Sequence, residues 1–99
     1  MRVPIKKQVS IVTGASSGIG LGITIALLEH GYRVVANSCA ISKSKDLKPS
    51  ADLVLVDGDI GKNETAIKAV DAAMKHFVQV DLLVNNAGRK HSKEPPRER

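Results

Sequence analysis

The stretch VTGASSGIG, residues 12–20, decides the fold. It completes an apolar run at 8–13 that is typical of a buried strand ending at a glycine turn. Residues 19–27 then carry apolar side chains at helical spacing, and Gly31 is the expected helix C-cap. The sequence therefore predicts a strand, a glycine-rich turn and a helix in immediate succession.

Each small residue of this turn has a distinct physical use. Gly14 suits a tight turn with positive φ, Gly18 lets a pyrophosphate approach the backbone, and Gly20 lets the helix pack against the strand. The helix N-terminus offers free N–H groups to a phosphate, and Ser16 and Ser17 can add hydroxyl donors. No Lys follows the last glycine, so a P-loop is disfavoured. A glycine-rich turn without ligand remains the alternative.

The rest of the chain alternates between strand and helix patterns. We expect strands at 33–37, 53–56 and 81–85, a second helix at 63–77 and a loop at 38–50 whose only possible helical piece is 45–47. One face of the second helix would carry Ile67, Val70, Ala73 and Met74. This order favours a parallel sheet with right-handed crossovers and strands buried on both faces. The predicted fold is α/β, a partial Rossmann (doubly wound) sheet with strand order 3-2-1-4.

A second motif, NNAG at residues 85–88, ends the fourth strand. In the predicted order this strand lies beside the first, so its carboxyl end would flank the glycine turn at the topological switch point. TGASSGIG together with DLLVNNAG, and DGDI between them, resembles the short-chain dehydrogenase/reductase family over about residues 5–88. The resemblance implies the N-terminal half of the family's domain and a nicotinamide dinucleotide cofactor.

The same resemblance assigns roles to individual residues. It implies that Thr13 and Asn85 brace the sheet. The positions implied to contact the dinucleotide are Gly14, Gly18, Ile19 and Gly20 at the pyrophosphate and nicotinamide side, Asp59 and Ile60 at the adenine, and Asn86, Ala87 and Gly88 at the ribose and nicotinamide. Phe77 is followed by Val78 where the family often has glycine, and Arg89 replaces the usual apolar residue.

The end of the second strand bears on the choice of cofactor. An acid there would bind the ribose 2′-OH of NAD, but the positions hold Asn37, Ser38 and Cys39. Lys43 and Lys45 lie near enough in sequence to attract a 2′-phosphate. The pattern favours NADP, with Ser38 and Cys39 at the site, and leaves NAD open.

The family's catalytic Tyr-x-x-x-Lys pair is not found in the sequence. Tyr32 is the single tyrosine, and the position four residues later is Ala36. His30 and His76 fall at helix ends, where a cation favours the dipole, and are not expected to be catalytic. We therefore expect no catalytic residue and no metal ligand set, and no turnover by the chain alone.

Composition limits the remaining possibilities. The 99 residues allow one domain, which we place at 1–88, followed by a basic, disordered tail at 89–99. The tail has five basic and two acidic residues but no aromatic side chain, so nucleic-acid binding is disfavoured. A single cysteine, no signal peptide and no membrane-spanning run indicate a cytoplasmic protein.

The size raises a question of completeness. A doubly wound domain normally has two such halves, so we expect a fragment truncated after the fourth strand, whose exposed edge would promote self-association. The abrupt tail suggests a frameshift or early stop, and a separate chain supplying the missing half is another possibility. A non-catalytic nucleotide-binding or interaction module is the alternative function.

Overall fold

The computed structural model describes residues 7–16 and 18–86. The order of its elements is β-α-β-η-β-α-β, with a 3₁₀ helix between the second and third strands. They are β1 (Val9–Thr13), α1 (Gly18–Glu29), β2 (Arg33–Ser38), η1 (Ile41–Lys43), β3 (Leu53–Asp57), α2 (Asn63–His76) and β4 (Leu82–Asn85). The expected tail at 89–99 lies outside the described residues.

The four strands form one parallel sheet in the order β3-β2-β1-β4, as predicted. Thr13 pairs with Asn37 on one side and with Asn85 on the other, and Ser38 pairs with Asp57. Because all four strands are parallel, their carboxyl ends lie at the same edge of the sheet. The residues that follow β1, β2, β3 and β4 are thereby collected along that edge.

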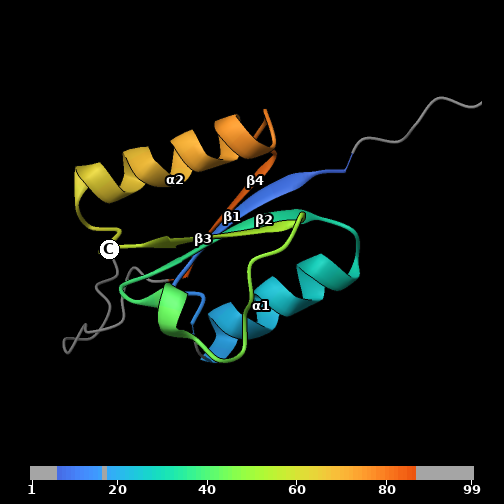
Figure 1. Ribbon diagram of the computed structural model, residues 1–99, viewed down its shortest axis with the longest axis horizontal. Coiled ribbons are helices and arrows are strands. Elements are labelled where there is room, and N and C mark those ends of the chain that lie inside the picture. The colour runs from blue at the N-terminus through green and yellow to red at the C-terminus, as the bar shows by residue number, and fades with distance from the viewer. Residues whose placement is uncertain (1–6, 17, 87–99) are drawn as a thin grey trace, which may run out of the picture.

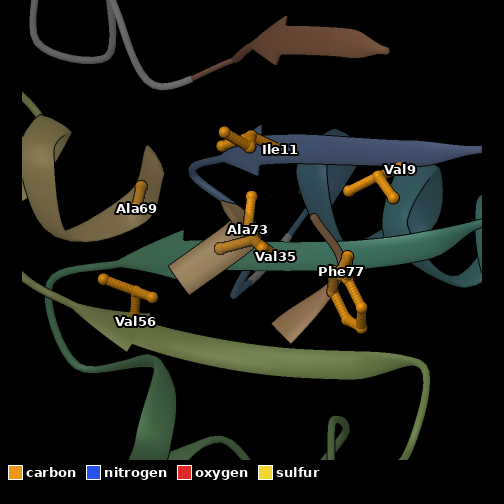
Figure 2. Close-up of a cluster of buried hydrophobic side chains, with 7 residues drawn as sticks. All are labelled: Val9, Ile11, Val35, Val56, Ala69, Ala73 and Phe77. Carbon is orange, nitrogen blue, oxygen red and sulfur yellow. The ribbon is translucent and has the colours of Figure 1, made fainter. Parts of the chain in front are cut away.

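The helices cover opposite faces of the sheet, with α2 on one side and α1 on the other (Figure 1). Both inner strands are buried on both faces, as expected for a sheet between two helical layers. The core on the α2 side contains the side chains shown in Figure 2: Val9, Ile11, Val35, Val56, Ala69, Ala73 and Phe77. The core on the α1 side contains Val12, Ala15, Val34, Ala36, Ile41, Leu47 and Leu53.

Helix α1 ends as its sequence predicts. Gly31 has φ of 88° and donates its N–H to Leu28 O at 3.1 Å, while Tyr32 donates to Leu27 O at 2.9 Å. These two bonds form the Schellman arrangement that favours glycine just past a helix. Tyr32 then packs against the α1-side core at the entrance of β2.

The connection between β2 and β3 differs from expectation. The helical turn is η1, not residues 45–47. Ile41 is fully buried in the α1-side core, and Leu47 is also buried, so both ends of the connection are held by apolar side chains. Burial of Ile41 fixes the turn directly after β2, and the residues around Leu47 run on without helical structure.

The apolar periodicity of both helices was misassigned in part. Ile19, which begins the apolar spacing of α1 and is implied by the resemblance to contact the dinucleotide, is 74% exposed at the first turn. On α2, Ala69 and Ala73 face the sheet, whereas Ile67, Val70 and Met74 remain 59%, 47% and 48% exposed. Small alanines lie on the sheet side because they let the helix approach the strands closely.

Within residues 7–16 and 18–86, no strand pairs with the outer side of β4, so β4 is an edge of the sheet, as predicted. Leu82 and Leu83 are 40% and 61% exposed, so β4 lacks the burial on both faces that β1 and β2 have. Between α2 and β4 lies an apolar groove of about 260 Å³ whose lining includes Ile11, Val70, Val80 and Leu83. We call Ile67, Val70, Met74, Leu82 and Leu83 the open-edge surface.

Candidate functional site

The glycine turn between β1 and α1 has the backbone geometry that its glycines predict. Gly14 and Gly18 have φ of 66° and 58°, a region that side chains with a Cβ rarely adopt. Ala15 donates its N–H to Asn37 O at 3.0 Å, which ties the turn to the end of β2. The turn is thus held at the carboxyl edge of the sheet.

Gly20 and Gly18 serve different purposes. A Cβ on Gly20 would lie 1.9 Å from Gly14 O and 2.7 Å from Asn86 Nδ2, so only glycine allows α1 to approach the turn this closely. A Cβ on Gly18 would meet nothing within 4 Å. Gly18 therefore faces open space, and the exposed Ile19 follows it.

The open space at Gly18 is suited to an anion. The first turn of α1 contains no acidic residue, so no side-chain carboxylate there competes for its N–H groups. A helix N-terminus carries partial positive charge and unpaired N–H donors. A phosphate could therefore approach the backbone at Gly18 without steric hindrance, and the residues present fit a pyrophosphate.

Thr13 and the two asparagines join the ends of β1 and β4. Thr13 Oγ1 accepts the N–H of Asn86 at 3.0 Å and donates toward Asn85 Oδ1 at 3.1 Å. Asn86 Nδ2 donates to Gly14 O at 3.2 Å. The brace expected of Thr13 and Asn85 is therefore present, and Asn86 extends it to the glycine turn. Ala87 and Gly88, the last two predicted site residues, lie outside the described residues.

The residues at the end of β2 differ in how deeply they are buried. Asn37 is 1% exposed and donates from Nδ2 to Val56 O at 2.9 Å and Gly58 O at 3.2 Å. This amide therefore fixes the end of β3. Ser38 Oγ lies 2.8 Å from Ser16 Oγ in the glycine turn, and Cys39 is exposed.

The end of β3 holds a carboxylate, Asp57, which is the first residue of the DGDI segment. Asp57 Oδ1 accepts the N–H of Ser42 at 2.8 Å, and Asp57 Oδ2 accepts the Ser42 hydroxyl at 2.7 Å. The hydroxyl bond and the main-chain bond from Ser42 are the main causes that lower the pKa of Asp57; burial opposes them less strongly, and the charges of Lys68 and Lys43 add smaller lowering effects. We call this pair of bonds the Asp57–Ser42 clamp.

The predicted adenine residues follow in the next turn. Asp59 is exposed, and its Oδ1 accepts the N–H of Gly61 at 2.8 Å. Ile60 is half-buried and lines the groove beside α2. Both lie beyond the carboxyl end of β3.

The structure brings together five of the predicted site residues around the glycine turn. They are Gly14, Ser16, Gly20, Ser38 and Asn86, joined directly or through Asn37 and Thr13. Gly18 and Ile19 begin α1 beside them, and Cys39 follows Ser38. Ser17 lies outside the described residues. Sequence reasoning missed the contact between Asp57, in the DGDI segment, and Ser42.

Taken together, the strand order, the glycine turn at the carboxyl edge and the β1–β4 brace define a Rossmann-type, dinucleotide-binding architecture. A family profile for short chain dehydrogenases matches residues 8–98. The chain belongs to the short chain dehydrogenase family. It corresponds to the N-terminal, cofactor-binding portion of these oxidoreductases.

Individual relatives agree with this assignment. General stress protein 39 of Bacillus subtilis is 31% identical over 96 residues, covering 91% of this chain and 34% of its own length. Versicolorin reductase 1 of Aspergillus parasiticus is 33% identical, covering 82% of this chain and 33% of its own length. The chain thus spans about a third of the length of the curated relatives it matches.

Solved structures give the same picture. An apo SCOR enzyme from Clostridium thermocellum matches 86% of this chain and 35% of its own, with a TM-score of 0.73 and 32% identity. A 3-ketoacyl-(acyl-carrier-protein) reductase from Brucella melitensis complexed with NADH matches with a TM-score of 0.71 and 29% identity, over 79% of this chain and 33% of its own.

Across residues 7–16 and 18–86, every helix falls short of the length and apolar content that a membrane crossing requires.

Proposed function

We propose that this chain binds a nicotinamide dinucleotide across the carboxyl edge of its sheet, with the pyrophosphate at Gly18. The observation that carries the proposal is the contrast between Gly20, which is closed by Gly14 O and Asn86, and Gly18, which faces open space. When bound, the dinucleotide supplies hydride transfer. The chain's own residues bind and orient it: Thr13, Asn86 and the turn keep the phosphate site in shape.

NADP is the cofactor we favour. The buried Asn37 amide donates its hydrogen bonds to main-chain oxygens at the end of β3. The residues available to contact the adenosine end are therefore Ser38 and Cys39, and neither is an acid. Without a carboxylate at the end of β2, a 2′-phosphate meets no direct repulsion there. The exposed Lys43, the last residue of η1, adds positive charge close enough to act on Asp57 at the end of the neighbouring strand β3.

We also propose that the isolated chain has no oxidoreductase turnover and resides in the cytoplasm. Tyr32 packs against the α1-side core, and the position four residues later is Ala36, which is fully buried in β2. Neither residue can supply the proton transfer that the family resemblance requires. The single cysteine, Cys39, is free and exposed, which supports a reducing compartment.

The phosphate site is tested by placing a branched side chain on it. Gly18→Val should abolish binding of NADPH and NADH measured by calorimetry, because the new side chain occupies the open space and strains a residue with φ of 58°. Gly22→Val is the matched control: Gly22 is exposed on the same helix with no neighbour within 4 Å of a Cβ. Undiminished binding by Gly18→Val would refute the proposed site.

The alternative function, an interaction module, draws on the open-edge surface. An exposed strand edge and exposed apolar side chains on α2 and β4 promote association with another chain. Light scattering should detect self-association that Leu83→Lys suppresses, since a charge blunts the edge. Ile25→Lys, at a 38% exposed position on α1, should leave it unchanged. A monomeric wild-type chain would contradict this part of the proposal.

A further inference from the structure

The Asp57–Ser42 clamp joins two elements that are distant in the sequence. Asp57 is the last residue of β3 and lies in register with Ser38, the last residue of β2. Ser42 is the central residue of η1, the turn that leaves β2. Both of the bonds that Ser42 makes to the carboxylate are short, at 2.8 and 2.7 Å. The clamp therefore fixes η1 against the carboxyl edge of the sheet.

A second anchor gives the turn a defined orientation. Ile41, the first residue of η1, is fully buried in the core, and the next residue, Ser42, is hydrogen-bonded to Asp57. Asp57 is itself held, because Lys68 on α2 lies 3.4 Å from its main-chain oxygen. Two neighbouring residues of one turn are thus fixed to different partners, and Lys43 comes directly after them.

The charges around Asp57 favour an indirect role. Each carboxylate oxygen already accepts one hydrogen bond from Ser42, which donates both its N–H and its hydroxyl. Lys68 and Lys43 are close enough for their charges to act on the carboxylate. The negative charge is therefore compensated locally. The end of β2, where an acid would bind the ribose of NAD, contains no carboxylate.

We propose that Asp57 is a positioning residue for cofactor choice: through Ser42 it holds η1 so that Lys43 stays at the adenosine end and favours a 2′-phosphate over a 2′-hydroxyl. This inference rests on the proposed function, because it needs the dinucleotide to bind at this edge. It assigns a role to a carboxylate that the glycine turn and the β1–β4 brace do not use.

The test compares NADPH and NADH affinity in variants of the full chain by calorimetry. Asp57→Asn keeps the shape of the side chain but removes its charge. It should weaken NADPH binding about tenfold, equivalent to one charge-assisted contact, and change NADH binding by less than about twofold. Ser42→Ala should have the same selective effect. Asp46→Asn, an exposed aspartate in the same connection, is the control and should change neither.

A double variant separates positioning from direct contact. If Asp57 acts through Lys43, adding Asp57→Asn to Lys43→Gln should change NADPH affinity by less than about twofold. Equal weakening of both cofactors, or no change in either, would overturn the inference while leaving cofactor binding intact. Weaker NADH and tighter NADPH binding would also overturn it, since Asp57 would then bind the ribose itself. A wild-type chain that binds neither cofactor would refute both proposals.

Thermal melting tests whether the variants still fold like the wild-type chain. Asp57→Asn and Ser42→Ala must keep the cooperative unfolding of the wild-type chain in the absence of cofactor. Amide exchange at residues 41–43 supplies a readout that does not depend on cofactor. Exchange should accelerate in both variants, because Asp57→Asn removes the charge that strengthens both bonds and Ser42→Ala removes the hydroxyl bond. Unchanged exchange would show that the clamp does not hold the turn, and would overturn the inference.

Discussion

Replacing Gly20 with alanine should destabilise the protein, although alanine favours helices. The added Cβ would lie 1.9 Å from Gly14 O and 2.7 Å from Asn86 Nδ2. The closest atom is main chain in a turn that is bonded to β2, so it cannot rotate away as a side chain would. Relief requires α1 to move away from the turn and from the Asn86 amide.

The magnitude follows from two opposing effects. Overpacking typically costs about 1–3 kcal/mol and sometimes more, while Gly→Ala in a helix gains about 0.5–1 kcal/mol. Because the clash is with backbone, we expect the upper part of the overpacking range and a net loss of about 2 kcal/mol. For a domain of this size each 1 kcal/mol lowers the melting temperature by about 4–8 °C.

Gly22→Ala provides the matched control on the same helix. Gly22 is exposed, and a Cβ there meets nothing within 4 Å, so only the gain in helix propensity remains. Circular dichroism melts and urea titrations of the three proteins give the comparison. If Gly20→Ala melts at or above the wild-type temperature, the close approach of α1 to the glycine turn is wrong.

Other predictions address the remaining contacts of the site. Thr13→Val should lower the free energy of unfolding by about 1–3 kcal/mol, because the N–H of Asn86 loses its acceptor. Thr24→Val loses only a bond to Gly20 O within α1, so it should lower the free energy of unfolding by less in the same urea titrations. Asp57 has a lowered pKa in the folded chain, so its contribution to stability is complete above the unfolded pKa of about 3.9 and is lost as pH falls through the lower folded pKa. Urea titrations at pH 2–6 should show this acid-side loss in the wild type and less of it in Ser42→Ala; identical pH profiles would contradict the clamp.

The architecture could be predicted because local patterns agreed with the topology. The run before Gly14, the glycine turn itself and the apolar segment at 81–85 each follow simple rules for strands and turns, and the order 3-2-1-4 is the one that a doubly wound sheet predicts. Gly20 is an example: the sequence predicts that it allows helix and strand to pack closely, and the atoms of Gly14 and Asn86 leave no room for a Cβ there.

The errors arose where tertiary contacts outweigh periodicity. Ile67, Val70 and Met74 have helical spacing, yet the sheet is covered by Ala69 and Ala73. Sequence spacing alone does not say which of two adjacent helix faces meets the strands. The connection after β2 was misplaced because burial of an isolated isoleucine carries no periodic signal.

Some features of the candidate site could be predicted from the sequence and others could not. Motif positions such as Gly18 and Asn86 could be identified from the sequence because their spacing is distinctive. The hydrogen bonds of Asp57 could not, because its partner Ser42 is fifteen residues away and lies beside it only when β2 pairs with β3. Asn37 was considered for the ribose, but its burial and its bonds to β3 are visible only in the folded chain.

The central claim is that the chain binds a nicotinamide dinucleotide at the glycine turn. Thermal melting with and without NADPH at about 100 times its dissociation constant tests it most directly. A ligand that binds only the folded chain at this excess stabilises it by about 2.7 kcal/mol, so the wild-type melting temperature should rise by at least about 10 °C and that of Gly18→Val should not move. A wild-type melting temperature that is unaffected by NADPH and by NADH at the highest concentrations that stay in solution would contradict the account.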